Sequence, residues 1–207
     1  MAVHLVEHPL VQDTLLVLRN AQTGAAVFRR MARRISVLLA AEALRDLPTV
    51  PSRVATPMGE AEGRRIGADV VVVPVLRSGL GMLDAVLELL PSARVGHIGL
   101  QRDEATAVAS QYYAKLPNGL AGSYVLMIDP MLATGGSAAE ALDVLERAGA
   151  REIRILCIVA APEGIALVER RFPDVRIYTP VIDRGLDDRK FIVPGLGDFG
   201  DRLYGTL

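Results

Sequence analysis

An acid followed by a glycine-rich turn offers the clearest chemistry in this sequence. Asp129 ends the apolar run SYVLMID, and Thr134, Gly135, Gly136 and Ser137 lead from it into a helical pattern. Glycines let backbone N–H groups approach a ligand closely, and a helix N-terminus offers unpaired donors and a positive dipole. The pattern therefore predicts a sugar-phosphate site, in which the acid accepts ribose hydroxyls and the turn holds the phosphate. A valine at Gly135 is expected to block the phosphate and leave the fold largely intact.

Two other interpretations of this turn were weighed. It is not a Walker loop, because no Gly-Lys-Ser/Thr occurs in it. It could instead be an ordinary glycine turn in which Ser137 caps the helix. The acid placed ahead of the turn favours a binding function.

A second strand end carries a cation. Arg77 follows the β-branched run DVVVVPVL and precedes Ser78, Gly79 and Gly81. A guanidinium at the edge of a buried strand needs a partner, and a diphosphate would bind it together with the loop amides. The alternative is a strand-to-helix turn with Arg77 in a structural ion pair.

Alternating strand and helix patterns surround these motifs. Continuous apolar runs predict strands at 69–76, 93–100, 123–129, 153–161 and 175–182, and helical spacing predicts helices at 9–20, 24–46, 79–90, 136–148 and 162–172. Such βα alternation indicates a parallel sheet covered on both faces, which binds ligands at the carboxyl ends of its strands. Residues 50–57 are expected to form a short extended arm, and 183–207 a separate lobe or long loop.

Two segments leave alternatives open. In the helix at 24–46, an arginine cluster forms a solvated face, a subunit contact or an anion site; its members are Arg29, Arg30, Arg33 and Arg34. Residues 103–122 separate two strands without a clear helix. This segment is a mobile lid that excludes water, or a β-hairpin arm that makes dimer contacts.

Composition excludes several protein classes. Hydrophobic residues make up 51% and charged residues 23%, which is typical of a globular chain, and the net charge of −1 argues against nucleic-acid binding. Cys157 is expected to be a buried hydrophobe, and a lone cysteine permits no internal disulfide. The N-terminus lacks a signal-peptide pattern, and no apolar run is long enough to span a membrane. We therefore expect a cytoplasmic protein with no membrane partner.

Several motifs, in order along the chain, resemble those of the uracil phosphoribosyltransferase family. The longest are VLRSGLGM at 75–82, DPMLATGGS at 129–137 and IVPGLGDFGDR at 192–202. Shorter ones are HPLV at 8–11, EALRDLPT at 42–49, RDE at 102–104, YYAKLP at 112–117 and CIVAAPEGI at 157–165. Related phosphoribosyltransferases usually carry a second acid where Pro130 stands, and the proline is the pattern of the uracil branch.

The resemblance implies a fold and a domain organisation. It implies an α/β, type I phosphoribosyltransferase fold with a mostly parallel central sheet flanked by helices, a flexible lid or arm and a C-terminal base-binding lobe. The chain would be a single domain, with N-terminal helices at 9–46, a core at about 69–182 and a base-binding tail at about 183–207.

The resemblance also implies an activity. Uracil and 5-phosphoribosyl diphosphate would give uridine 5′-monophosphate and diphosphate, a step of pyrimidine salvage. Mg²⁺ is the expected cofactor, carried on diphosphate oxygens and water without direct protein ligands. The expected partners are the two small-molecule substrates and further copies of the chain, in a homodimer or homotetramer. Some members are allosteric enzymes that bind GTP.

Site residues carry over by motif. Arg77, Asp129 and Asp198 are the expected catalytic residues. The uracil pocket is expected at Ile192, Gly197, Asp198 and Phe199. Phosphoribosyl diphosphate is expected to contact Arg77, Arg102, Asp129, Pro130, Met131, Leu132, Ala133, Thr134, Gly135, Gly136, Ser137 and Asp198.

The tail departs from the usual family pattern. The family more often has Asn-Glu at Asp187-Asp188, Gly at Lys190, Tyr at Phe191 and Ala at Phe199. These departures predict altered base affinity or base specificity, so a phosphoribosyltransferase for another base is one alternative. A non-catalytic nucleotide sensor or RNA-binding regulator on the same fold is another, since a fold alone does not decide function.

Overall fold

A mostly parallel sheet organises the chain in this computed structural model, which describes residues 3–102 and 109–206. The strands, in spatial order, are β1 (Val3–Leu5), β12 (Arg176–Thr179), β10 (Glu152–Leu156), β8 (Tyr124–Ile128), β4 (Val70–Leu76), β6 (His97–Arg102) and β7 (Ala109–Lys115), with β5 (Arg94–Val95) also paired to β4. All of these pairings are parallel except β6 with β7. The expected parallel α/β sheet is confirmed.

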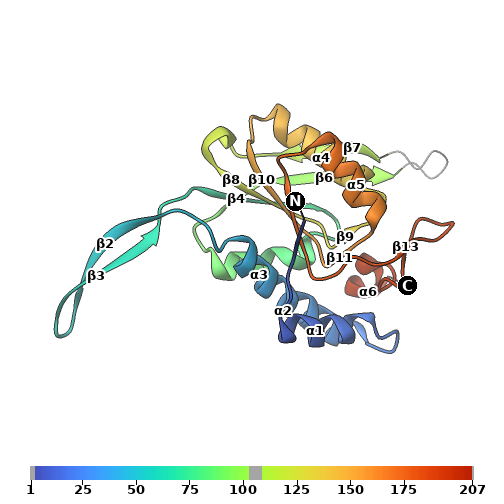
Figure 1. The fold of residues 1–207 in the computed structure, drawn as a ribbon, viewed down its shortest axis with the longest axis horizontal. Helices are drawn as coiled ribbons and strands as arrows, with labels where there is room; N and C mark the ends of the chain where they lie inside the picture. Colours follow the sequence, from blue (N-terminus) through green and yellow to red (C-terminus); the bar gives the residue numbers. More distant parts are fainter. Residues whose placement is uncertain (1–2, 103–108, 207) are drawn as a thin grey trace.

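Helices cover both faces of the sheet, as the βα alternation predicts. One face carries α4 (Gly136–Arg147) and α5 (Pro162–Arg171); the other carries α1 (Pro9–Arg19), α2 (Ala25–Ala43), α3 (Leu80–Leu89) and α6 (Phe199–Tyr204). Figure 1 shows these two layers above and below the strands. Side chains alternate along β4, so Val71 and Val73 pack under α4 and α5 while Val72 packs with α2 and α3. Neither face of β4 is exposed to water, which explains its run of consecutive valines.

The strand expected at 153–161 is two short strands. β10 ends at Leu156, and β11 (Val159–Ala160) pairs instead with β9 (Met131–Leu132). The chain changes partner because the amides of Ile158 and Val159 both donate to the carbonyl of Pro130, at 2.8 and 3.1 Å. This small second sheet lies where β8 and β10 end, next to the glycine turn.

The tail is ordered rather than a long loop. It contains the hairpin of β13 (Gly185–Leu186) and β14 (Ile192–Val193), followed by α6. Figure 1 shows β9, β11, β13 and α6 at one end of the molecule. The described part of the tail, residues 183–206, therefore lies at the carboxyl edge of the sheet.

Residues 103–108 lie outside the described part of the chain, so a lid there stays a prediction. Residues 109–115 form β7, which runs antiparallel to β6, and a 3₁₀ turn (Leu120–Gly122) follows. The hairpin alternative for 103–122 is correct in this respect.

A long hairpin projects from the body. β2 (Thr49–Thr56) pairs with β3 (Gly59–Ile66) over eight residue pairs, and Figure 1 shows the pair extending away from the sheet. The sequence predicted only the outgoing strand, at 50–57, and missed the return. Its exposed apolar side chains are Val50, Val54, Met58 and Ile66. Across residues 3–102 and 109–206, no helix is long and apolar enough to cross a membrane.

Candidate active site at the carboxyl edge of the sheet

The register of β4 and β8 brings the two sequence motifs together. Pro74 pairs with Ile128, so the loops that follow both strands emerge side by side. The hydroxyl of Ser78 donates to Oδ1 of Asp129 at 3.4 Å, and the amide of Met131 approaches the same oxygen at 3.5 Å. The amide of Asp129 donates to the carbonyl of Leu156 at 3.1 Å. The acid is thus held at the sheet edge by long, weak contacts that leave it free to accept a ligand.

Burial sets the charge behaviour of Asp129. It raises the pKa of this carboxyl to about 6, because desolvation outweighs the bonds from Met131 and Ser78 that lower it. Cys157 is fully buried behind it, and burial, with the nearby acid, raises the thiol pKa to about 12. Such a thiol carries no thiolate at neutral pH, so the expected buried hydrophobe is confirmed.

The two glycines of the turn face different sides, which the sequence did not predict. Gly135 has a φ of +82°, in the left-handed region, and is the N-cap of α4. A Cβ on Gly135 would lie 2.9 Å from the carbonyl oxygen of Gly164 in α5. A Cβ on Gly136 would meet only Oγ1 of Thr134, at 3.6 Å. Gly135 therefore faces α5, and Gly136 faces the open side.

This geometry excludes one alternative and corrects one expectation. The helix starts at Gly136, so Ser137 is not its cap. A valine at Gly135 would collide with α5 backbone and occupy a φ that side chains rarely adopt, so it would not leave the fold intact.

Arg77 is exposed beside this turn. Its guanidinium has no ion-pair partner among the residues that the structure describes, so the structural ion pair considered above is not found there. Its peptide bond with Leu76 is cis, and its carbonyl accepts from the hydroxyl of Tyr204 at 3.3 Å. Gly79 lets the loop sit close to β8, since a Cβ there would lie 2.5 Å from the carbonyl oxygen of Ile128.

The tail motif forms a turn and a helix start. Asp198 is the N-cap of α6, and its Oδ1 accepts from the amide of Asp201 at 2.9 Å. The Phe199 ring is buried and packs edge-on against Phe28, with centroids 5.2 Å apart. The ring therefore packs in the core against α2, and the expected contact of Phe199 with the base stays a prediction.

The backbone conformation at Lys190 explains why the family more often has glycine at this position. Lys190 has a φ of +68° in the turn of the β13–β14 hairpin, a conformation that favours glycine. Asp187 stabilises this turn, because its Oδ1 accepts from the amides of Arg189 and Phe191 at 2.9 and 2.8 Å. The side chains of Lys190 and Phe191 are exposed.

For the remaining expected site residues, the structure gives the backbone position or the burial alone. Arg102 ends β6 and pairs with Ala109, but its side chain lies outside the described part. Ile192 is buried in β14, and Gly197 has a φ of +80°. The sequence reasoning missed Asp183, although the signal was available, since it follows a buried strand as Asp129 does.

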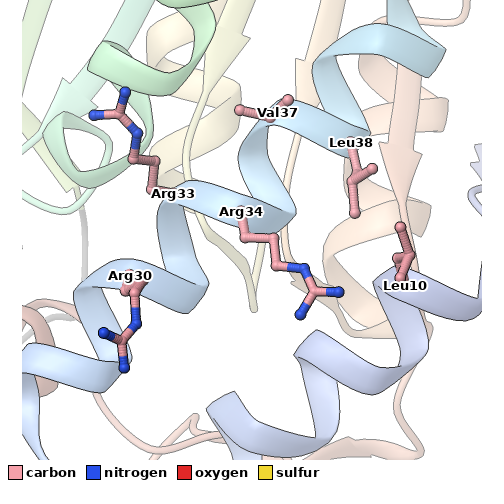
Figure 2. Close-up of a pocket in the computed structure, with 6 residues that line it drawn as sticks. All are labelled: Leu10, Arg30, Arg33, Arg34, Val37 and Leu38. Carbon is pink, nitrogen blue, oxygen red and sulfur yellow. The ribbon is translucent and has the colours of Figure 1, made fainter.

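The arginine cluster on α2 borders a groove beside α1. The groove has a volume of about 350 Å³ and is lined by Leu10, Arg30, Arg33, Arg34, Val37 and Leu38. Figure 2 shows Arg34 directed towards α1, whereas Arg30 and Arg33 point away from it. Arg33 pairs with Glu88, and Arg34 pairs with Asp13 at 3.3 Å. Diverging and partnered cations favour the solvated face over an anion site.

The donor set at the sheet edge limits how a metal could bind. Over residues 3–102 and 109–206, no three His, Cys, Asp or Glu side chains come together in a group that could hold a metal ion. Asp129 is a single carboxylate that accepts from the hydroxyl of Ser78. The edge therefore fits Mg²⁺ only if a substrate supplies most of the oxygen ligands.

Comparison with known proteins identifies the family. The sequence profile named uracil phosphoribosyltransferase matches residues 5–206. The chain belongs to this family. A uracil phosphoribosyltransferase of Symbiobacterium thermophilum is 48% identical over 203 residues, covering 98% of this chain and 97% of that protein. One of Shouchella clausii is 46% identical over 205 residues, covering 99% and 98%.

Solved structures share the fold of this chain. The AQ2163 protein from Aquifex aeolicus superposes with a TM-score of 0.93 at 35% identity, covering 98% of this chain and 97% of that one. An adenine phosphoribosyltransferase from Trypanosoma brucei, with AMP, pyrophosphate and ribose-5-phosphate, has a TM-score of 0.58 at 14% identity, covering 92% and 84%. The latter shows the fold alone, which is the expected phosphoribosyltransferase fold.

The direction of the glycine turn can be tested by substitution. Gly136→Val places methyl groups on the open side, so it should weaken binding of phosphoribosyl diphosphate by at least roughly tenfold with little change in Tm. Calorimetric titration measures the affinity. Gly135→Val is the matched variant and should lose Tm or fail to fold. Unchanged affinity in a folded Gly136→Val protein would exclude this turn as the phosphate site.

The pKa of Asp129 predicts a pH-dependent cost to stability. Because the folded-state pKa is raised, the folded protein loses stability as pH rises from about 4 towards about 6. Asp129→Asn should therefore raise Tm at pH 7.5, and this gain should shrink as pH falls below 6. Thermal unfolding of both proteins between pH 4.5 and 7.5 measures it. An equal Tm difference at every pH would show that the carboxyl is not destabilised by burial.

Proposed function

We propose that the chain transfers the 5-phosphoribosyl group of phosphoribosyl diphosphate to uracil, which gives uridine 5′-monophosphate and diphosphate. Family membership over residues 5–206 supports a phosphoribosyltransferase that acts on uracil in pyrimidine salvage. The observation that carries the proposal is the meeting of Asp129, the glycine turn and Arg77 at one sheet edge, where Arg77 has no ion-pair partner among the described residues.

The charges at this edge suit a dissociative transfer. Displacing diphosphate from the anomeric carbon builds positive charge on the ribose and negative charge on the leaving group. Asp129 would accept the ribose hydroxyls and lie near the developing cation, while Arg77 would bind diphosphate oxygens. With a pKa of about 6, Asp129 is mostly ionised at neutral pH, as this role requires. Catalysis would then rest on orientation and charge stabilisation, without a protein nucleophile.

The family resemblance also implies Mg²⁺, which we propose binds with the substrate. The diphosphate and water would supply its ligands, with no carboxylate group gathered to hold it among the described residues. When bound, it would offset part of the diphosphate charge. Arg77 and the amides at the start of α4 would still position the phosphate groups.

Backbone groups in the tail are proposed to read the base. The turn Pro194-Gly195-Leu196-Gly197 carries no amide or basic side chain. Uracil presents O4, N3–H and O2, so a carbonyl near Ile192 would accept from N3–H, and amides around Gly197 to Phe199 would donate to the oxygens. With cytosine, the protein carbonyl would face the lone pair of N3, and a protein amide would face the amino group of the base. Unpaired groups of this kind cost about 1–3 kcal/mol each.

Several further features stay proposals. A homodimer or homotetramer is supported by the projecting β2–β3 hairpin, because an isolated two-stranded hairpin with exposed Val54 and Met58 is marginal in water. Sedimentation equilibrium would decide the oligomeric state. Allosteric binding of GTP and a cytoplasmic location rest on the resemblance and on the sequence.

The role of Arg77 can be tested by truncation. If its guanidinium stabilises charge on the leaving diphosphate, Arg77→Ala should lower kcat and kcat/KM together by roughly 10²-fold or more. Because the side chain is exposed, Tm should change little. Steady-state kinetics with varied phosphoribosyl diphosphate measure the effect. A rise in KM alone would assign Arg77 to substrate binding and not to the transition state.

Base choice tests the proposed function directly. The measured quantity is kcat/KM for uracil, 5-fluorouracil, cytosine and hypoxanthine with phosphoribosyl diphosphate and Mg²⁺. Uracil and 5-fluorouracil should react, and cytosine should be slower by up to roughly 10⁴-fold, because a site built on buried hydrogen bonds rejects a mismatched base.

The other outcomes are equally informative. If cytosine or hypoxanthine comes within about tenfold of uracil, the backbone-reading pocket is wrong and the enzyme serves another base. If no base reacts, the non-catalytic nucleotide sensor or regulator becomes the better interpretation.

A further inference from the structure

A partly buried ion pair links the first helix to the base-reading turn. Arg19, the last residue of α1, donates from Nη1 and Nη2 to Oδ2 and Oδ1 of Asp183, at 2.9 and 2.6 Å. The Asp183 side chain is only 4% exposed. These residues are 164 positions apart in sequence, so this contact ties the start of the chain to its end.

The same pair holds both polar groups of one glycine. The amide of Gly195 donates to Oδ2 of Asp183 at 2.8 Å, and its carbonyl accepts from Nη1 of Arg19 at 2.8 Å. Gly195 has a φ of +58°, and a Cβ there would lie 2.1 Å from the carbonyl oxygen of Ile192. The turn is therefore tight, and the ion pair fixes the peptide groups on both sides of its central residue.

A second arginine bridges the same two segments from the other direction. Arg202 of α6 donates to the carbonyl of Leu196 at 2.7 Å and to that of Asn20 at 2.7 Å, and it also donates to the carbonyl of Leu18. Its guanidinium lies over the Phe28 ring, 4.5 Å from the centroid. A cation on the last carbonyls of α1 is favourable, because these carbonyls lack helical partners and carry the negative end of the helix dipole.

We infer that Arg19, Asp183 and Arg202 form a brace that positions the turn at 194–198 for recognition of the base. The brace donates to the carbonyls of Gly195 and Leu196 and so fixes the direction of these two peptide groups. It thereby positions the groups on either side that are proposed to read the base, at Ile192 and at 197–199. None of the three side chains is proposed to touch substrate; they are positioning residues.

This inference rests on the proposed function and makes a separate claim. If the brace sets only the base-reading turn, disturbing it should impair uracil binding and spare phosphoribosyl diphosphate, whose proposed contacts lie mainly at Arg77 and 129–137. A general loss of stability would not separate the two substrates.

The test compares two acid-to-amide variants in the full-length protein. Asp183→Asn keeps an acceptor for the Gly195 amide but removes the ion pair. Asp46→Asn is the control: Asp46 pairs with the buried Arg154 and with Arg176, away from the base turn, so it should also lower Tm. We expect KM for uracil to rise about tenfold in Asp183→Asn only, with KM for phosphoribosyl diphosphate within about twofold, and uracil selectivity over cytosine to fall.

If Asp183→Asn does not fold, a matched arginine pair replaces it. Arg202→Lys cannot reach all three carbonyls, whereas Arg171→Lys alters an arginine that also lies over a phenylalanine, Phe172, and pairs with Asp143. Only Arg202→Lys should raise KM for uracil.

The outcomes separate the inference from the proposed function. A brace variant that folds and keeps the wild-type KM for uracil, or raises both KM values equally, overturns the inference. Failure of the wild-type protein to use uracil overturns the proposed function instead.

Discussion

The pairing of β4 with β8 is the constraint on which the candidate site depends. Both strands are buried on both faces, so they have no freedom to shift register without moving apolar side chains into the wrong layer. Their parallel direction brings two carboxyl ends to one edge, where Ser78 reaches Asp129. Residues 51 positions apart thus meet because of sheet geometry alone.

Charges at this edge fall into two groups with different physical consequences. Asp129 and Arg77 have no opposite charge paired with them among the described residues, and burial of Asp129 shifts its pKa upward. Asp183 is more deeply buried but is fully engaged by Arg19 and the Gly195 amide. An uncompensated charge costs stability and is available to a ligand, whereas a compensated one fixes the backbone. This difference distinguishes charged groups that are suited to bind a ligand from charged groups that are suited to position the backbone.

Much of the fold and of the site could be predicted, because strong local patterns carried the information. The valine run of β4 and the helical spacing of α2 and α4 gave the right elements, and placing Asp129 and Arg77 at strand ends followed from them. The features that the sequence did not reveal depend on contacts with segments far away along the chain. The partner of β11 is the Pro130 region, and the face of Gly135 is set by Gly164. The Phe199 ring packs on Phe28, a contact across 171 positions that periodicity does not reveal.

The tail illustrates how a short helix can join two substrate loops. α6 has six residues: Asp198 caps its start within the proposed base turn, and Tyr204 at its end donates to the carbonyl of Arg77 in the proposed diphosphate loop. Between these ends, Leu203 packs so close to Gly81 that a Cβ there would lie 2.5 Å from Cδ2 of Leu203. Since the brace from α1 holds the same turn, the N-terminal helices do more than cover the sheet. They hold the turn that leads into α6, and so they position the base-reading half of the proposed site from the other end of the sequence.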